Sequence, residues 1–356
     1  MDLRLDLDRP SPELTAVLCD IPSVSGSEQT LADAVEAALR ARSHLRVDRD
    51  GDTVVARTEL GRAQRVVIAG HLDTVPIAGN LPTRRDDEVL WGRGTVDMKG
   101  GVAVALRLAA HLRDPERDVT YVLYDNEEVE AERNGLGRIA QARPEWLQAD
   151  FAVLMEPTSA AVEGGCNGTL RVGVTTRGKA AHSARWWRGS NAIHAAGGVL
   201  DRLRAYTPAE IEVDGLRYRE GLNAVGVEGG IAGNVIPDRC VVTVNYRFAP
   251  SRDESAAVEH VREVFDGFEV ELLDTAPGAR PGLDQPAAAA FVAAVDGEVR
   301  AKEGWTDVAR FSALGIPAVN FGPGDPLLAH ADDERVDVRE IERCEDRMHA
   351  WLTAAF

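Results

Sequence analysis

Short apolar segments alternate with helical periodicity in the first part of the chain. Residues 11–42 have a helical pattern interrupted by a loop at 21–27, and Leu31, Val35 and Leu39 fall on one face. A second, apolar helix is expected over 101–112, and compact apolar runs typical of buried strands cover 53–57, 65–69, 119–124 and 151–154. This alternation predicts an α/β domain in which helices cover a sheet.

The pattern changes after Gly168. Residues 170–176 alternate between apolar and polar positions, as in a half-buried strand. The segments that follow predict helix, strand, strand, helix and strand at 191–203, 221–231, 239–248, 253–265 and 268–273. This βαββαβ order is that of the ferredoxin-like fold. The stretch 275–286, rich in proline and glycine, is then expected to be the exit linker.

The α/β pattern resumes beyond this linker, at 287–295, 318–321 and 338–355. A chain of 356 residues exceeds one ordinary core, so two domains are expected. We predict a larger domain formed by residues 1–167 and 288–356, with a mixed sheet flanked by helices. A smaller, ferredoxin-like domain is predicted to be inserted into it at 168–287.

Composition narrows the class of protein. A hydrophobic content of 44% with 28% charged residues is ordinary for a soluble globular protein. The N-terminus lacks a signal-peptide pattern and no apolar run has the length of a membrane span, so a cytoplasmic protein is expected. The four cysteines form no CxxC pair and are expected to be reduced thiols. A net charge of −18 argues against nucleic acid and anionic membranes as partners.

Acidic residues and histidines stand where apolar runs give way to loops. Four such positions, in chain order, are His71, Asp97, Glu127-Glu128 and Glu156, and His330 follows near the C-terminus. In open α/β sheets, ligands bind outside the carboxyl ends of the strands. The ordered set therefore indicates a buried pair of metal ions.

The first two members of this set each have a plain structural alternative. In His71-Leu72-Asp73, the carboxylate could orient a metal-bound imidazole, or the motif could be a surface turn. Asp97 precedes the predicted helix 101–112, so it is either a helix N-cap or a carboxylate that bridges two cations.

The adjacent acids Glu127 and Glu128 are more informative. Two carboxylates side by side in a half-buried place repel each other unless a cation offsets the cost. Metal-dependent hydrolysis uses such a pair, because one carboxylate binds metal while the other moves a proton. The alternative is a solvated acidic loop, since Glu130 and Glu132 follow. Taken alone, Glu156 could equally be a surface acid, and His330 an exposed loop histidine.

Together, these residues resemble the M20 family of di-zinc amidohydrolases and peptidases. The matching motifs are HLDTVP (71–76), GRGTVDMKGG (92–101), EE (127–128), EP (156–157), AH (181–182), SNAI (190–193), NVIPD (234–238) and AH (329–330). The resemblance implies a zinc-peptidase-like catalytic domain whose inserted ferredoxin-like domain serves as a lid and mediates a homodimer. It also implies two Zn²⁺ per subunit, with Co²⁺ or Mn²⁺ as plausible substitutes.

The resemblance further implies a role for each position of the metal site. His71 and Glu156 would bind one zinc, Glu128 and His330 the other, and Asp97 would bridge the two, with a cis peptide bond to Met98. Asp73 would orient His71, and Glu127 would be the general base acting on the water that the zincs hold. His182 would reach the partner's active site, although it could instead be a strand-end residue at the start of a loop.

Within the family, three segments are most similar to bacterial succinyl-diaminopimelate desuccinylases: 185–188 (RWWR), 245–247 (NYR) and 304–311 (GWTDVARF). The implied reaction is hydrolysis of N-succinyl-LL-2,6-diaminopimelate to LL-2,6-diaminopimelate and succinate. Because that substrate carries several carboxylates, Arg247 and the loop at Thr306 are expected to receive anions. Asn234 is a further expected substrate contact by family analogy. Arg247 could alternatively form a salt bridge on the strand surface.

One departure keeps other activities open. Family members often carry a proline after the AH histidine, where this chain has Trp186 or Trp187. The alternatives are an acetylornithine deacetylase, an N-acyl amino-acid hydrolase or a dipeptidase of the same family. A non-catalytic binding or scaffold homologue is a further alternative, although none of the seven metal-site positions is missing.

Overall fold

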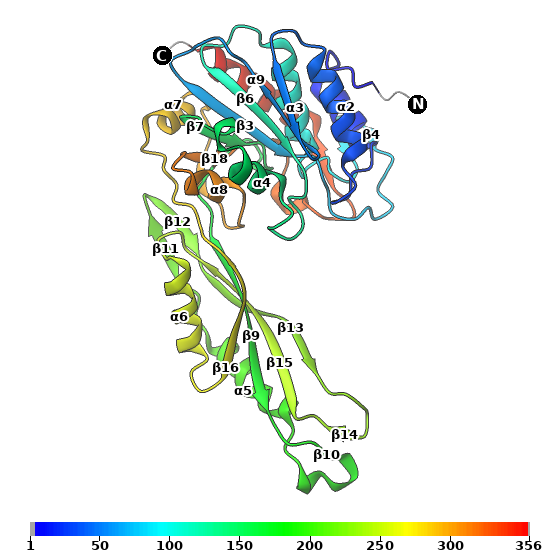
Figure 1. The fold of residues 1–356 in the computed structure, drawn as a ribbon, viewed down its shortest axis with the longest axis vertical. Coiled ribbons are helices and arrows are strands. Elements are labelled where there is room, and N and C mark those ends of the chain that lie inside the picture. Colours follow the sequence, from blue (N-terminus) through cyan, green and yellow to red (C-terminus); the bar gives the residue numbers. More distant parts are fainter. Residues whose placement is uncertain (1–3, 355–356) are drawn as a thin grey trace. The chain divides into compact units, whose positions relative to one another are not determined.

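The computed structural model describes residues 4–354, and these form two compact units. The first unit contains the described residues of Met1–Gly164 and Arg310–Phe356, together with Gly282–Arg300. The second unit contains Gly165–Pro281 and Ala301–Ala309. Figure 1 shows the helices and strands of both. None of the helices in the described chain is long and apolar enough to span a bilayer.

The first unit is built around a sheet with helices packed against it. Up to Gly164 its elements are α1 (Ser11–Cys19), α2 (Gln29–Arg40), β1 (Arg46–Asp50), β2 (Thr53–Arg57), β3 (Arg65–His71), β4 (Arg84–Asp86), β5 (Val89–Trp91), α3 (Lys99–His111), β6 (Asp118–Tyr124), α4 (Gly135–Ala142), the 3-10 helix η1 (Pro144–Trp146), β7 (Phe151–Leu154) and β8 (Val162–Gly164). The later elements are α7 (Pro286–Val295), β17 (Val299–Ala301), α8 (Val308–Ala313), β18 (Ala318–Asn320), η3 (Pro326–Leu328), β19 (Arg335–Asp337) and α9 (Val338–Thr353). The predicted helix 338–355 ends in the described chain at Thr353, and Ala355 lies outside the described residues.

The large sheet has eight strands in the order β1-β2-β6-β3-β7-β18-β8-β17. Its centre is parallel, since β3 pairs in parallel with both β6 and β7, and β18 pairs in parallel with β7. The flanking pairs β1–β2, β2–β6 and β18–β8 are antiparallel, so the sheet is mixed as predicted. A small separate sheet, β19-β5-β4, ties the segment after His330 to Trp91.

Side chains of the central strands alternate between two buried faces. Val66 and Ile68 of β3 point into the main hydrophobic core, which also contains residues of α1, α3, α7 and α9. Val67 and Ala69 are also fully buried, which fits a strand covered on both faces. The continuous apolar runs that predicted these strands therefore reflect burial on two sides.

The second unit has its own sheet and core. Its elements are β9 (Gly168–Arg177), β10 (Ala181–His182), η2 (Ser183–Arg188), α5 (Ala192–Ala205), β11 (Glu210–Val213), β12 (Leu216–Arg219), β13 (Gly221–Gly229), β14 (Val235–Ile236), β15 (Arg239–Phe248), α6 (Glu254–Val264) and β16 (Glu269–Ala276). Four antiparallel strands lie in the order β13-β15-β9-β16. With α5 and α6 this is the expected βαββαβ order, and β11–β12 is an additional hairpin.

One face of this sheet is covered by its two helices. On β15, alternate residues such as Val242 and Val244 are buried against Ala196 of α5 and Val261 of α6. The intervening positions are only partly buried. Alternation with period two is typical of a sheet with one packed face.

Several features differ from the sequence prediction. The short strands β1 (Arg-Val-Asp-Arg-Asp) and β4 (Arg-Arg-Asp) carry mostly charged residues, so no hydrophobic pattern marks them. Residues 282–287 group with the first unit, and residues 165–167 and 301–309, which the predicted boundaries place with the larger domain, group with the second unit. Local hydrogen bonds hold them there, because the Asn167 side chain donates to the Glu303 carbonyl and the Trp305 indole donates to the Pro277 carbonyl.

Candidate metal centre

Three neighbouring strands deliver the candidate ligands to one edge of the large sheet. His71 is the last residue of β3, Glu156 follows β7, and Glu127-Glu128 follow β6. These strands are parallel neighbours, so their carboxyl ends meet at the same edge. The strand-end positions that the sequence singled out are therefore close in space.

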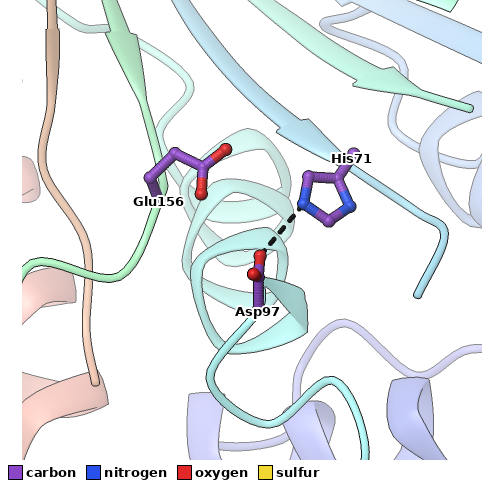
Figure 2. A group of neighbouring side chains, drawn as sticks. All are labelled: His71, Asp97 and Glu156. Carbon is purple, nitrogen blue, oxygen red and sulfur yellow. Dashed lines mark hydrogen bonds and ion pairs between the residues drawn. The ribbon is translucent and has the colours of Figure 1, made fainter. Parts of the chain in front are cut away.

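Donor atoms converge there, and two of the groups that they form share Asp97. The first contains His71, Asp97 and Glu156, and the second contains Asp97, Glu128 and His330. Within each group, one donor atom from every residue lies within 4.8 Å of the others. Figure 2 shows the first group, with the side chains of Glu156, Asp97 and His71 facing one another near the N-terminal end of α3.

A glycine allows this close approach of α3 to β7. A Cβ atom at Gly101 would lie 2.1 Å from the carbonyl oxygen of Met155, the residue before Glu156. Any larger residue would therefore push the first turn of α3, and Asp97 with it, away from Glu156.

The His71 side of the site is buried. The side chain of His71 is 1% exposed, and its Nε2 lies 3.1 Å from Asp97 Oδ1. Its Nδ1 lies 3.0 Å from the main-chain oxygen of Asp73 and 3.5 Å from that residue's carboxylate. Burial alone would lower the pKa of His71, but hydrogen bonds and charge from Asp73 and Asp97 raise it well above its ordinary value.

The His330 side is open. The side chain of His330 is 50% exposed, and its Nε2 lies 2.8 Å from Glu128 Oε1 and 3.2 Å from Asp97 Oδ2. Hydrogen bonds to Asp97 and Glu128 raise the pKa of His330 to about 10, against the opposing effect of desolvation. The loop histidine is thus half-exposed, yet it is engaged by two carboxylates.

Asp97 joins the two sides through its two oxygens. Oδ1 faces His71 and Oδ2 faces His330, an arrangement that suits a bridging carboxylate. The N-cap alternative is wrong, because α3 begins after Met98 and has no side-chain cap. The peptide bond between Asp97 and Met98 is cis, as the resemblance implied. Desolvation would raise the pKa of Asp97, but the two histidines hold it below its ordinary value.

Asp73 is completely buried and contacts the loop of Glu127 and Glu128 as well as His71. Its Oδ1 accepts a hydrogen bond from the main-chain N–H of Glu127 at 3.0 Å, and its Oδ2 accepts from that of Glu128 at 3.1 Å. The hydroxyl of Ser25 donates to Oδ2 at 2.8 Å. Burial would raise the pKa of Asp73, but His71 and these main-chain donors lower it. One carboxylate therefore fixes both the histidine strand end and the loop that carries the two glutamates.

The donor set fits divalent metal ions. Imidazole nitrogens and carboxylate oxygens without cysteine suit zinc and its first-row neighbours. Glu127, adjacent to this set, lies with Glu128 and His71 in a third group of donor atoms. A solvated acidic loop does not describe this pair, because Glu128 is 10% exposed while Glu130 is 72% exposed.

Sequence reasoning missed three residues that hold the site. Ser25 supports Asp73, and a buried pair, Arg93 and Glu334, contacts the main chain beside Asp97 and His330. Arg93 lies within the motif of residues 92–101, but neither it nor the other two were assigned a role, because serine and charged residues in loops are ordinarily exposed. Contacts between segments far apart in the chain bury Arg93 and Glu334 and partly bury Ser25.

The predicted substrate contacts lie in the second unit. His182 is exposed at the end of β10, where its Nδ1 accepts a hydrogen bond from the N–H of Ala184. Asn234 is also exposed, and its main-chain carbonyl accepts a hydrogen bond from the N–H of Ser183. The two are neighbours, because His182 pairs with Val235. Thr306 is buried in the 301–309 segment.

Arg247 is a partly buried cation on β15. Its Nε donates to Asn245 Oδ1 at 3.2 Å, and desolvation lowers its pKa. Among residues 4–354, no carboxylate forms an ion pair with it. The surface salt bridge considered from the sequence is therefore absent from the described chain, and the guanidinium is left without a counter-charge.

Comparison with known proteins agrees with this geometry. Residues 67–354 match the model of peptidase family M20/M25/M40. The chain is 57% identical over 351 residues to a Mycobacterium tuberculosis protein assigned as the succinyl-diaminopimelate desuccinylase DapE, covering 98% of this chain and 99% of the relative. It is 50% identical to the succinyl-diaminopimelate desuccinylase of Corynebacterium glutamicum, with coverage of 95% and 94%.

A solved structure supports the fold. The Bacillus subtilis protein described as a dinuclear metal-binding peptidase from the M20 family superposes with a TM-score of 0.72 at 17% identity, covering 96% of each chain. The matched region exceeds half of the chain, and both relatives are well above 30% identical. The chain belongs to peptidase family M20/M25/M40.

Proposed function

We propose that this enzyme hydrolyses the amide bond of N-succinyl-LL-2,6-diaminopimelate, releasing succinate and LL-2,6-diaminopimelate. The observation that carries the proposal is the convergence of His71, Asp97 and Glu156 in one group and Asp97, Glu128 and His330 in another. The two desuccinylase relatives, which match nearly the whole chain, support this substrate.

We propose two Zn²⁺ as the metals, with Co²⁺ or Mn²⁺ as substitutes. His71 and Glu156 would hold one ion, Glu128 and His330 the other, and Asp97 both, because its oxygens face the two histidines separately. When bound, two divalent cations supply Lewis acidity that polarises the amide carbonyl and acidifies the attacking water.

In this proposal Glu127 is the general base. One oxygen of its carboxylate accepts a proton from the attacking water and returns it to the nitrogen of the departing amine. Asp73 fixes its position, because the Asp73 carboxylate accepts from the main-chain N–H groups of both Glu127 and Glu128. The base and the neighbouring ligand therefore share one anchor.

The uncompensated charge of Arg247 favours an anionic substrate. A partly buried guanidinium without a carboxylate partner in the described chain is costly unless a ligand supplies the counter-charge. A carboxylate of the substrate would pair with it by charge-assisted hydrogen bonds. We propose Thr306 and Asn234 as further substrate contacts, on the basis of the family resemblance.

We further propose that the second unit is the lid and forms a homodimer in which His182 serves the partner's site. The exposed position of His182 supports this role, because its imidazole lies at the surface of the unit and is not held in a core. We propose a cytoplasmic location, which the four free, buried cysteines support.

A turnover panel tests the substrate. Purified enzyme loaded with zinc is given N-succinyl-LL-2,6-diaminopimelate, N-acetylornithine and dipeptides, and the released amine is measured. Hydrolysis of the succinyl substrate alone is expected. Turnover restricted to acetylornithine or dipeptides would replace the proposed substrate with one of the family alternatives. Arg247→Met should raise KM for the succinyl substrate while leaving metal content unchanged.

A further inference from the structure

We propose that the buried ion pair between Arg93 and Glu334 is a positioning device for the metal centre. It would set the register between Asp97 and His330, and thereby the affinity for both metal ions. This inference rests on the proposed function, because it assigns the pair a role toward the metals of that site. Neither residue offers a donor atom to the two groups of candidate ligands.

Glu334 reaches the main chain of the bridging aspartate. Its side chain is 0% exposed, and its Oε1 accepts hydrogen bonds from the N–H of Val96 at 2.9 Å and of Asp97 at 3.2 Å. Glu334 lies four residues after His330, in the same loop. A single carboxylate oxygen therefore connects the loop of one candidate ligand to the main chain of another.

Arg93 completes the connection. Its Nη1 donates to Glu334 Oε2 at 2.8 Å and to the carbonyl of Ala331, next to His330, at 3.2 Å. Its Nε donates to the carbonyl of Pro76 at 3.2 Å, in the segment that follows His71 and Asp73. The guanidinium therefore contacts two segments besides its own, the His330 loop and the segment that follows His71. Arg93 itself lies four residues before Asp97.

The placement of these bonds argues for more than general stability. A buried ion pair is weak support for stability, since desolvation offsets much of its attraction. Here the pair binds main-chain groups within a few residues of His71, Asp97 and His330. Because Asp97 presents one oxygen to each histidine, a small rotation of its main chain would misalign both metal positions.

The His330 loop especially needs such a device. His330 has a positive φ of 64° and is half-exposed, so neither a strand nor core packing fixes it. The Glu334 main chain adds one more bond, as its carbonyl accepts from the N–H of Gly92. The ion pair thus positions the His330 loop, whereas the end of strand β3 positions His71.

The test compares zinc affinity and kinetics in Glu334→Gln and Arg93→Lys. Glutamine keeps the shape but loses the negative charge opposite Arg93, and lysine keeps the positive charge but lacks the fork that reaches two carbonyls. Zinc affinity is measured without substrate, by competition with a chromophoric chelator. Supporting residues of metal ligands typically change affinity about 10-fold to 100-fold, and a loss of that size is expected for Glu334→Gln. kcat should fall with KM nearly unchanged, and Arg93→Lys should lie between the wild type and Glu334→Gln.

Glu345→Gln is the matched control. It breaks another ion pair of the first unit, in which Arg107 Nε lies 2.8 Å from Glu345 Oε1 between α3 and α9. That variant should keep both zinc affinity and kcat. If Glu334→Gln does not fold, Arg93→Lys alone decides, because it retains the buried charges. Wild-type zinc affinity in the variants, or an equal loss in Glu345→Gln, overturns the proposal.

The two proposals fail separately in this design. If the wild type binds two zinc ions but does not hydrolyse the succinyl substrate, the proposed substrate falls while the positioning role remains measurable by affinity. If the wild type hydrolyses the substrate and the Glu334→Gln protein binds zinc normally, only the positioning role falls.

Discussion

The two sides of the candidate metal centre are held by different means. His71, 1% exposed, ends a central strand, whereas His330, 50% exposed, lies in a loop with a positive φ. The sheet sets the first ligand, since β3 is paired on both sides. Beside the second ligand, the Glu334 carboxylate accepts from the N–H of Asp97, and the Arg93 guanidinium donates to the carbonyl of Ala331.

This difference means that one side of the site is rigid and the other is accessible. The buried side fixes one end of the site through the core of the sheet, and on the open side His330 is half-exposed to water. A hydrolase needs both, because reacting groups must be held in place while substrate and products exchange. Each variant below changes one side of the site or the base beside it.

The largest effect is expected from Glu127→Gln. Glutamine cannot accept the proton of the attacking water, so kcat should fall by about 100-fold to 10,000-fold. Metal content should stay at the wild-type value, because neither side of the site loses a ligand. Glu130→Gln, in the exposed part of the same loop, is the control and should be fully active. Loss of metal in Glu127→Gln would mean that base and ligand are assigned wrongly.

Next, His71→Ala and His330→Ala should separate stability from metal binding. Both should bind metal poorly, but only His71→Ala should strongly destabilise the metal-free protein. Removing His71 leaves Asp73 and Asp97 without their shared buried partner, which should lower the free energy of unfolding by about 3 kcal/mol or more. Removing the half-exposed His330 should cost about 1 kcal/mol or less. Denaturant unfolding of the metal-free variants measures this, and equal losses would remove the distinction between the sides.

A smaller difference should appear when metal is removed from the wild type. A chelator that reports metal release should show two phases, the faster from the open side, because water can replace the exposed His330 ligand more readily. The His330→Ala protein should lack the fast phase. A single phase that releases both ions would show that the two sides exchange metal as one unit.

The smallest effect is expected from Ser25→Ala. It removes one hydrogen bond to Asp73 Oδ2, worth about 1 kcal/mol, while the main-chain donors of Glu127 and Glu128 remain. A decrease in kcat of a few-fold with unchanged KM is expected. Ser27→Ala, at an exposed serine of the same loop, should behave as the wild type. A large loss of metal in Ser25→Ala would place Ser25 closer to the ions than its contacts indicate.

The buried side was predictable from the sequence, because apolar runs marked strand β3, which ends at His71, and strand β7, which ends two residues before Glu156. The ferredoxin-like order was likewise visible in the alternation of β9 and β15. The supports of the open side were not. Glu334 is the last of three consecutive acids, Asp332-Asp333-Glu334, and only packing against residues 92–97 makes it the buried one.

The same limit applies to Ser25 and to β1. Ser25 sits in a polar loop, and its contact with Asp73 bridges 48 positions of the chain. The strand β1 carries four charged residues of five, so only its pairing with β2 makes it a strand. The local sequence pattern indicates burial and periodicity, whereas the Ser25 contact and strand β1 depend on contacts between distant segments.

The most direct test is a zinc titration of the metal-free enzyme with N-succinyl-LL-2,6-diaminopimelate as substrate. Release of succinate is followed as zinc is added, with Glu127→Gln in parallel. We expect activity to rise to a plateau at two equivalents of zinc per chain, and the variant to bind the same zinc without turnover. Absence of succinate release at every zinc level, or activity that does not depend on zinc, would contradict this expectation.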